Sequence, residues 1–154
     1  GKVNQILFHM VFSFLSSISF AVICNVPRKS IPIGGIVGMC GWIGYWLLSS
    51  EGYGVFLSSV VCSLLLAFTG HIFARIYKMP LTVFYVPGLV PIVPGITAFQ
   101  AFRLLTLHDY DGALIAFLNV GYCAVGIAVG LVVSDIIFKS GLYIIRNVKI
   151  ASKQ

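Results

Sequence analysis

The stretch VPGLVPIVPG, Val86 to Gly95, decides how this chain folds. It holds three prolines and two glycines in ten residues, and every other residue is Val, Leu or Ile. Prolines and glycines at this density are typical of surface loops, but surface loops are not this apolar. The stretch therefore predicts a backbone that leaves regular structure in an apolar part of the molecule.

The composition indicates what surrounds this stretch. The 154 residues are 59% hydrophobic and only 9% charged, and the mean hydropathy is +1.03. A soluble domain carries about 25% charged residues, so these charges are too few to cover a globular surface and lipid must be the solvent for much of the chain. The formal net charge is +6, and the basic residues that produce it lie mostly between the apolar runs. We interpret it as setting membrane orientation, and we expect no nucleic-acid partner.

The apolar runs predict an all-α integral membrane protein with a single transmembrane domain of about five helices. A helix needs about 20 apolar residues to cross a bilayer core of about 30 Å. The first run is too long for the apolar region of a signal peptide, so we count it as a span. The predicted spans are residues 5–24, 33–50, 55–73, 81–107 and 113–134, and a basic tail occupies 139–154.

The charged connections predict the orientation of these spans. Basic residues lie after the first and third spans and in the tail, whereas the other two connections are acidic. The basic ones include Arg28, Lys29, Arg75, Lys78 and Lys139, and the acidic ones are Glu51, Asp109 and Asp111. By the positive-inside rule the N-terminus lies outside and the C-terminus in the cytoplasm, which requires an odd number of crossings. The alternative is four crossings with a re-entrant Pro-rich stretch, which would put the tail on the side of the acidic connections.

The fourth span, residues 81–107, is predicted to be broken. Each proline inside a helix costs about 3 kcal/mol, so three would cost roughly 9 kcal/mol. Proline has no N–H, so helical pairing would leave the carbonyls of Val83, Pro87 and Val90 free. Free carbonyls are tolerated at membrane depth only where they face protein or a water-filled cavity. We therefore expect two half-helices joined near the midplane by unwound backbone that faces protein or a water-filled cavity rather than lipid. The alternative is a proline kink that affects only helix packing.

A break of this kind is typical of solute sites in broken-helix transporters. The second half-helix should begin near Gly95, and the free N–H groups of Ile96, Thr97 and Ala98 would then point at the break. A carboxylate could bind these N–H groups, while an ammonium group or cation could use the freed carbonyls. The candidate substrate-binding residues are Pro87, Gly88, Pro91, Pro94, Gly95, Thr97, Gln100 and Asn119.

Other polar residues in the spans have two interpretations each. Arg103 either gates or attracts an anionic solute or extends to the interface. Asn119 could instead form a hydrogen bond between helices. His71 and Asp135, each about one turn from a cytoplasmic helix end, form a proton relay or are simply interfacial polar groups. His9 is the only ionisable group of the first span.

Small residues give two spans a smooth face that lets helices approach closely. These residues are Gly34, Gly38, Gly41 and Gly44 in the second span, and Gly126, Gly130 and Ser134 in the last. Packing is the default interpretation, and two such faces also suggest docking on a partner. The four cysteines fall one to a hydrophobic segment, which indicates packing rather than disulfides or metal binding.

No catalytic motif is present: the sequence has no GxSxG, no HExxH, no phosphate-binding Walker loop and no carboxylate cluster at membrane depth. We therefore expect that the protein is not an enzyme and needs no metal or cofactor.

Three features together resemble the threonine/serine exporter (ThrE) family. They are the VPxxPxxPG block followed by ITAFQAF, the NVP of Asn25 to Pro27, and the five-span length with a basic tail. The resemblance is closest to the family's small, purely membrane-embedded subunit, which corresponds to the C-terminal five-span half. The resemblance implies export of small amino acids such as threonine and serine, driven by the proton gradient across a bacterial cytoplasmic (inner) membrane.

The resemblance also implies a partner, because family members pair two five-span halves behind a cytoplasmic domain. We expect a second five-span subunit that carries this domain, or else a homo-oligomer. Some split pairs are associated with export of dicarboxylates such as succinate, which stays an alternative substrate. Two further interpretations stay open: a passive channel, and a structural subunit whose partner carries the transport site.

Overall fold

The computed structural model describes residues 1–153, and every regular element in that range is helical. The elements are α1 (Lys2–Ile23), the 3-10 helix η1 (Arg28–Ser30), α2 (Ile31–Ser50), α3 (Val55–Tyr77), α4 (Thr82–Leu89), α5 (Gly95–Thr106) and α6 (Tyr110–Ala151). Four stretches of helix are long and apolar enough to cross a membrane: Lys2–Ile23, Arg28–Ser50, Val55–Tyr77 and Tyr110–Ala151. This confirms an all-α, multi-pass membrane protein.

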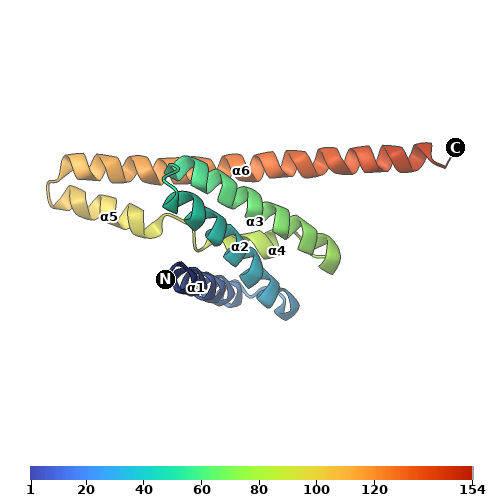
Figure 1. Ribbon diagram of the computed structural model, residues 1–154, viewed down its shortest axis with the longest axis horizontal. Helices are drawn as coiled ribbons and strands as arrows, with labels where there is room; N and C mark the ends of the chain where they lie inside the picture. The colour runs from blue at the N-terminus through green and yellow to red at the C-terminus, as the bar shows by residue number, and fades with distance from the viewer. Residues whose placement is uncertain (154) are drawn as a thin grey trace.

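Helices α1, α2 and α3 pack side by side, and small residues form their contacts (Figure 1). A Cβ atom on Gly38 of α2 would collide with Ser17 of α1 and lie 3.2 Å from the Cα of Gly88 in α4. One turn further, a Cβ on Gly41 would lie 3.2 Å from Leu66 of α3. Glycine at these positions therefore brings three other helices close to α2.

The second small-residue face joins α3 to α6. A Cβ on Gly126 would lie 2.8 Å from the carbonyl oxygen of Phe56, and one on Gly130 would lie 2.6 Å from that of Val60. Both small-residue faces are thus covered by helices of this chain. The expectation that they also dock a partner is wrong for these residues, because the chain's own helices already occupy the space.

The Pro-rich stretch separates two short helices, α4 and α5. Helix α4 ends at Leu89 and α5 begins at Gly95, so residues 90–94 join them without helical structure. Helix α4 packs against α1, α2 and α3, whereas α5 has α6 as its main neighbour. Each helix alone is shorter than the roughly 20 residues that a crossing needs, so a fifth crossing stays a prediction that requires α4 and α5 together.

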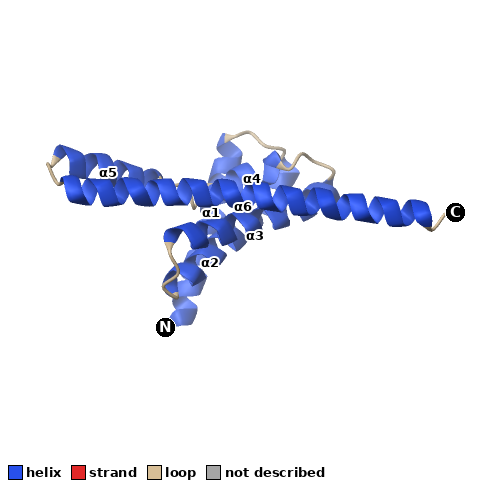
Figure 2. Cartoon of the chain, turned by 90° about the horizontal axis from the view of Figure 1, so that it is seen from above, coloured by secondary structure: helices blue, strands red, loops and turns tan. Residues whose placement is uncertain are grey.

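Helices α5 and α6 form an antiparallel hairpin that extends beyond the α2–α3 turn (Figures 1 and 2). The hairpin turn is capped by Asp109, whose side chain accepts a hydrogen bond from the N–H of Gly112 at 3.0 Å. This is the usual way in which Asp satisfies a free N–H at a helix start. The hairpin thus holds α5 beside the first turns of α6, away from the packed bundle.

Helix α6 is longer than the predicted last span. Its 42 residues correspond to about 63 Å at 1.5 Å per residue, twice the thickness of a bilayer core. The chain has no proline after Pro94, so nothing in the basic tail stops the helix before Ala151. Near the end of the predicted span, Asp135 and Lys139 form an ion pair at 2.9 Å, one turn apart on the same face.

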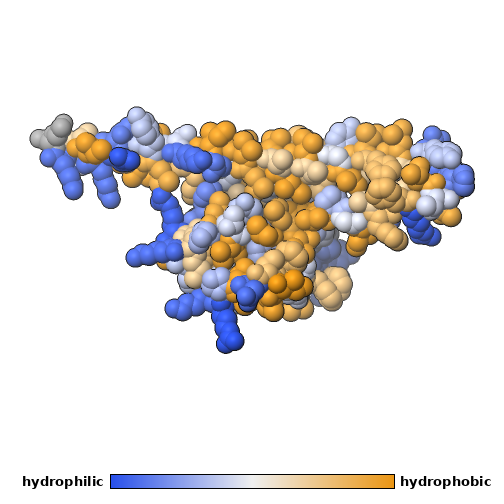
Figure 3. Space-filling model, turned by 180° about the vertical axis from the view of Figure 1, so that it is seen from behind, coloured by the Kyte–Doolittle hydropathy of each residue, from blue (hydrophilic) through white to orange (hydrophobic). Residues whose placement is uncertain are grey.

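The distribution of hydrophobic and hydrophilic side chains on the surface is typical of a protein embedded in a membrane. Orange, hydrophobic side chains cover the middle of the face shown in Figure 3, and hydrophilic ones gather toward the ends of the long helix and along one lower edge. The N-terminal end of α1 and the Glu51–Gly54 turn lie at one end of the α1–α3 bundle, since His9 contacts Trp46 near the end of α2. Arg28 and Lys78 lie at the opposite end, so acidic and basic connections are separated as the sequence predicts.

Candidate functional site

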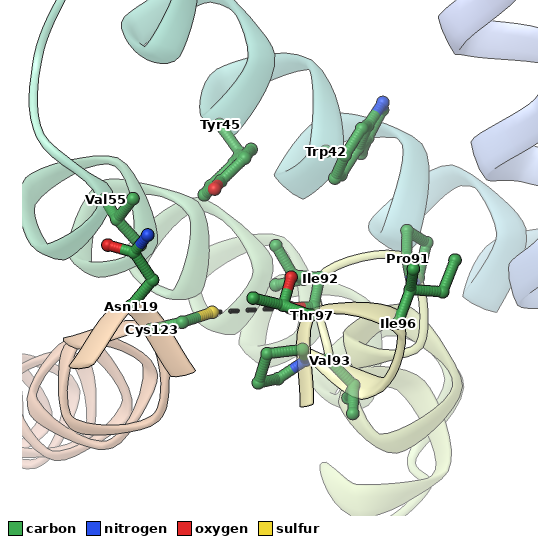
Figure 4. A pocket seen from close by; sticks show the side chains of 11 residues that line it. Trp42, Tyr45, Val55, Pro91, Ile92, Val93, Ile96, Thr97, Asn119 and Cys123 are labelled. Carbon is green, nitrogen blue, oxygen red and sulfur yellow. Dashed lines mark hydrogen bonds between the residues drawn. The ribbon is translucent and has the colours of Figure 1, made fainter. Parts of the chain in front are cut away.

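A cavity of about 310 Å³ lies beside the break between α4 and α5 (Figure 4). We call it the break cavity. Its lining residues are Trp42, Tyr45, Val55, Pro91, Ile92, Val93, Pro94, Ile96, Thr97, Asn119 and Cys123. They come from the break itself and from α2, α3, α5 and α6. None of these residues is charged, so the cavity offers polar groups without a net charge.

The backbone of the break is only partly hydrogen bonded. The carbonyl of Leu89 accepts from Ile92 N at 3.0 Å and from Val93 N at 3.1 Å, which closes one last turn after α4. Among the residues described, no donor reaches the carbonyl of Pro91, and the N–H groups of Ile96 and Thr97 have no acceptor. These three residues line the cavity, so it combines a free acceptor with free donors at a helix N-terminus.

Two details of the predicted break are wrong. The carbonyl of Pro87 is not free, because the N–H of Val90 donates to it at 3.3 Å. The N–H of Ala98 is not free either, since it donates to the carbonyl of Pro94 at 3.0 Å. In both cases a nearby donor or acceptor completes the helix end.

The structure brings together half of the predicted substrate residues. Pro91, Pro94, Thr97 and Asn119 all line the break cavity. Thr97 comes from the first turn of α5 and Asn119 from α6, and in Figure 4 both side chains border the same space. Their role in binding a solute stays a prediction.

The other predicted residues lie elsewhere. Pro87 and Gly88 are buried inside the packing of α4; Gly88 faces Gly38 of α2. Gly95 begins α5 and is exposed. Gln100 and Arg103 are exposed on α5 and do not line the cavity. Spacing placed Gln100 on the face of Thr97, but α5 packs mainly on α6 and leaves that position outside.

Sequence reasoning missed the wall that α2 contributes. Trp42 and Tyr45 stack with ring centroids 5.3 Å apart and close one side of the cavity. Cys123 closes another side, and its thiol donates to the carbonyl of Ile92 at 3.5 Å. The available signal was a pair of aromatic residues at i and i+3 in the second span, a spacing that places them on one face.

The break lies nearer one end of the bundle than its middle. Val55, the first residue of α3, lines the cavity, and Cys62, two turns later, shares a buried cluster with Ile92. Helix α4 packs alongside α3 near Gly70 and Leu66, and the depth of the break in the membrane stays a prediction.

His71 and Asp135 line a second cavity, of about 350 Å³, between α3, α4 and α6. Phe138 stacks on the His71 ring at 4.1 Å. Within the described residues, the Nε2 atom of His71 is buried and has no hydrogen-bond partner, while Asp135 is paired with Lys139. Tyr85 of α4 lines the same space. The structure thus places the two predicted relay residues around one cavity, and the relay itself stays a prediction.

Comparison with known families decides the class of protein. The family model described as Threonine/Serine exporter, ThrE, matches residues 9–137, which include the break and all lining residues of the break cavity. The chain belongs to the ThrE family. It is therefore a membrane transporter of the threonine/serine exporter type. No solved structure matches this ThrE-family chain.

Proposed function

We propose that this chain is half of a proton-coupled exporter of threonine and serine, and that the break cavity is its solute site. The observation that carries the proposal is the cavity itself. Its volume of about 310 Å³ is at the lower end of the roughly 300 to 1,000 Å³ typical of small-molecule sites. Its walls are formed by unwound backbone between two short helices, which is where broken-helix transporters bind their solutes.

The polar groups of the cavity suit a zwitterion. The N–H groups of Ile96 and Thr97 start helix α5 and suit a carboxylate. The free carbonyl of Pro91 and the side-chain oxygen of Asn119 suit an ammonium group. The hydroxyl of Thr97 can pair with a hydroxyl of the solute. All four residues line the cavity.

Dicarboxylate export is the second candidate, and the cavity supports it less well. A dicarboxylate brings two negative charges, and burying them without cations costs several kcal/mol. The cavity lining has no Lys or Arg, and Arg103 is exposed on α5. Export of succinate would therefore need cations from a partner subunit. Labelled threonine should compete with unlabelled serine for the site and not with succinate.

We also propose a partner, a second five-span subunit with a cytoplasmic domain, with a homo-oligomer as the alternative. The exposed apolar side chains of α5 support this, because Ile96 is 78% exposed, Phe99 69% and Phe102 59%, and Ile96 also lines the cavity. A partner that covers α5 would close the site on its open side. Co-expression with a candidate second half, followed by purification and mass measurement, tests the association.

The placement that we propose has five crossings, with α4 and α5 together forming the fourth. The N-terminus then lies outside and the C-terminus inside a bacterial cytoplasmic membrane. The separation of acidic and basic connections at opposite ends of the bundle supports this orientation. A cysteine introduced at Gly54 should then react with an impermeant thiol reagent added outside, whereas one at Lys78 should not.

Transport by purified protein in liposomes tests the whole proposal. The chain is reconstituted alone and with its candidate partner, and efflux of labelled threonine is followed with and without a pH gradient. Saturable efflux that needs the gradient supports the exporter. Flux that never saturates would indicate a passive pore. Saturable flux that is unchanged by Thr97→Val and by Asn119→Leu would indicate a structural subunit whose partner carries the site.

A further inference from the structure

His9 lies behind one wall of the break cavity. Its imidazole Nδ1 accepts a hydrogen bond from the indole Nε1–H of Trp42 at 3.1 Å, and Trp42 lines the cavity. In Figure 4 the indole nitrogen of Trp42 points away from Thr97 and Cys123, on the side of the ring opposite the cavity. Trp42 therefore borders the proposed solute site on one side and is hydrogen bonded to His9 on the other.

The surrounding rings hold this hydrogen bond in place. His9 packs against Trp46, with ring centroids 4.6 Å apart and planes inclined by 32°. On its other side, Trp42 stacks on Tyr45 at 5.3 Å and 20°. His9, Trp42 and Tyr45 thus form a chain of contacts that ends at the cavity, so His9 is linked to the cavity wall through Trp42.

His9 is also reached from the end of the bundle. It lines an open hollow of about 480 Å³ together with Asn4, Gln5, Trp46 and Ser50. This hollow lies where α1 begins and α2 ends, beside the Glu51–Gly54 turn. In the orientation proposed above, that end faces the outside. Protons from the outer solution therefore reach His9 without passing through the break cavity.

Few charged groups surround His9. On α1 the titratable groups of this end are the amino group of Gly1 and the side chain of Lys2, and on α2, with its cap, they are Cys40, Tyr45 and Glu51. On α4 the one titratable residue is Tyr85, which lines the cavity of His71. Within the described part of the chain, no carboxylate lies at ion-pair distance from His9. The hydrogen bond to Trp42 is therefore the contact that depends on the protonation of His9.

We propose that His9 is the residue through which outside protons act on the solute site. Neutral His9 holds Trp42 in the cavity wall, and protonated His9 releases it. The proton binds at Nδ1, which then carries a hydrogen and can no longer accept from Trp42; the indole N–H turns to water instead. Histidine is the side chain that ordinarily changes charge between about pH 5 and 8.

This inference rests on the proposed function and adds the direction of coupling. An exporter that exchanges solute for protons must bind its solute less tightly when a proton arrives from outside. Release of Trp42 weakens solute binding, because the side chain that forms the cavity wall opposite Thr97 is no longer fixed by the hydrogen bond to His9. His9 is thus a positioning residue for the solute site, and it acts through Trp42.

Tryptophan fluorescence tests the His9 contact directly, because the chain has two tryptophans and both contact His9. Imidazolium quenches indole emission, so emission of the purified full chain should fall in one step between about pH 8 and pH 5. The step should disappear in His9→Gln, which keeps an acceptor for Trp42 but cannot be protonated. It should persist in His71→Gln and His108→Gln, which change the other two histidines. A step that survives in His9→Gln, or a flat curve in the wild type, overturns the proposal.

Solute binding tests the consequence for the cavity. Threonine affinity of the wild type should be about five- to tenfold weaker at pH 5 than at pH 8, the factor that one lost neutral hydrogen bond gives. His9→Gln should bind equally at both pH values, and Trp42→Phe should bind weakly at both. If His71→Gln removes the pH effect and His9→Gln keeps it, the proton acts at the second cavity and the proposal is wrong. If threonine does not bind at any pH while the fluorescence step is intact, the proposed solute fails and the His9 switch is supported.

Discussion

Helices α4 and α5 come from one apolar stretch, but their surroundings differ. Helix α4 is enclosed by α1, α2 and α3, and its Phe84, Pro87 and Gly88 are buried. Helix α5 packs mainly on α6 and has only Ala101 buried. Residues 90–94 join the enclosed helix to the open one, and the break cavity lies at this joint.

The difference indicates which of the two helices can move. A helix enclosed on three sides is fixed by close packing, because packed interiors do not deform continuously. A helix held by one neighbour can tilt about the unwound residues that precede it. We therefore interpret α4 as the fixed part of the proposed solute site and α5, with Thr97, as the part that would close on a solute.

Truncating a phenylalanine in each helix should have the largest and most unequal effect on stability. Phe84 has no exposed surface and belongs to the buried cluster of Val37, Cys62 and Leu66. Phe84→Ala should cost about 3 to 5 kcal/mol of unfolding free energy, the usual cost of emptying such a site. Phe102 is 59% exposed, and Phe102→Ala should cost about 1 kcal/mol, the worth of its edge contact with Phe117. Thermal unfolding in detergent measures both; equal losses would contradict the comparison.

Enlarging one glycine that packs against α4 and one that begins α5 should give the next largest difference. A Cβ on Gly38 meets Ser17 and the backbone of Gly88, so Gly38→Val should destabilise by about 1 to 3 kcal/mol through overpacking. A Cβ on Gly95 meets nothing within 4 Å. Gly95→Ala should therefore fold normally and gain about 0.4 to 1 kcal/mol by restricting the unfolded chain. The melting temperatures of the two variants measure this difference. A destabilised Gly95→Ala would show that neighbouring residues enclose the start of α5.

Removing one hydroxyl from α5 should impair transport and leave stability unchanged. Thr97→Val keeps the shape of the side chain and removes a hydrogen bond to the solute, which should raise the half-saturating threonine concentration about five- to tenfold. Thr106→Val is the matched control, because Thr106 lies at the other end of α5 and its hydroxyl bonds only to the carbonyl of Arg103 at 2.6 Å. Efflux from liposomes measures both. The same increase in both variants would mean a general effect on α5.

The smallest effect should come from the ion pair in the second half of α6. Asp135 and Lys139 are paired at 2.9 Å with side chains 46% and 76% exposed, and exposed pairs are worth about 0.2 to 1 kcal/mol. Lys139→Met should therefore shift the unfolding free energy by no more than this. Threonine affinity should be unchanged, since neither residue lines the break cavity. A loss of affinity in this variant would connect the second cavity to the solute site.

The sequence predicted the local features of this molecule well. Proline removes an N–H wherever it stands, so the positions of Pro91 and Pro94 predicted the non-helical residues before α5 and its start at Gly95. Pro87 was also expected in the break, but it lies inside α4. The same local reasoning placed Thr97 in the first turn of α5. It was wrong for the carbonyl of Pro87 and the N–H of Ala98, because it did not count the nearby groups that complete each helix end.

Features that depend on contacts between distant segments could not be predicted. The walls from Trp42, Tyr45 and Val55 depend on how α2 and α3 pack around the joint, and one sequence does not contain that information. Gln100 was misplaced for the same reason. The bond from Trp42 to His9 joins residues 33 positions apart, so spacing gave no indication of it.

Protection of one engineered cysteine by solute tests whether threonine binds between α4 and α5. In a chain whose four native cysteines are replaced, Thr97→Cys and Thr106→Cys are each labelled with a small thiol reagent, with and without saturating threonine. We expect threonine to slow labelling at residue 97 severalfold and to leave it unchanged at residue 106. Equal labelling rates at residue 97 with and without threonine, in a variant that still exports it, would show that threonine does not bind there.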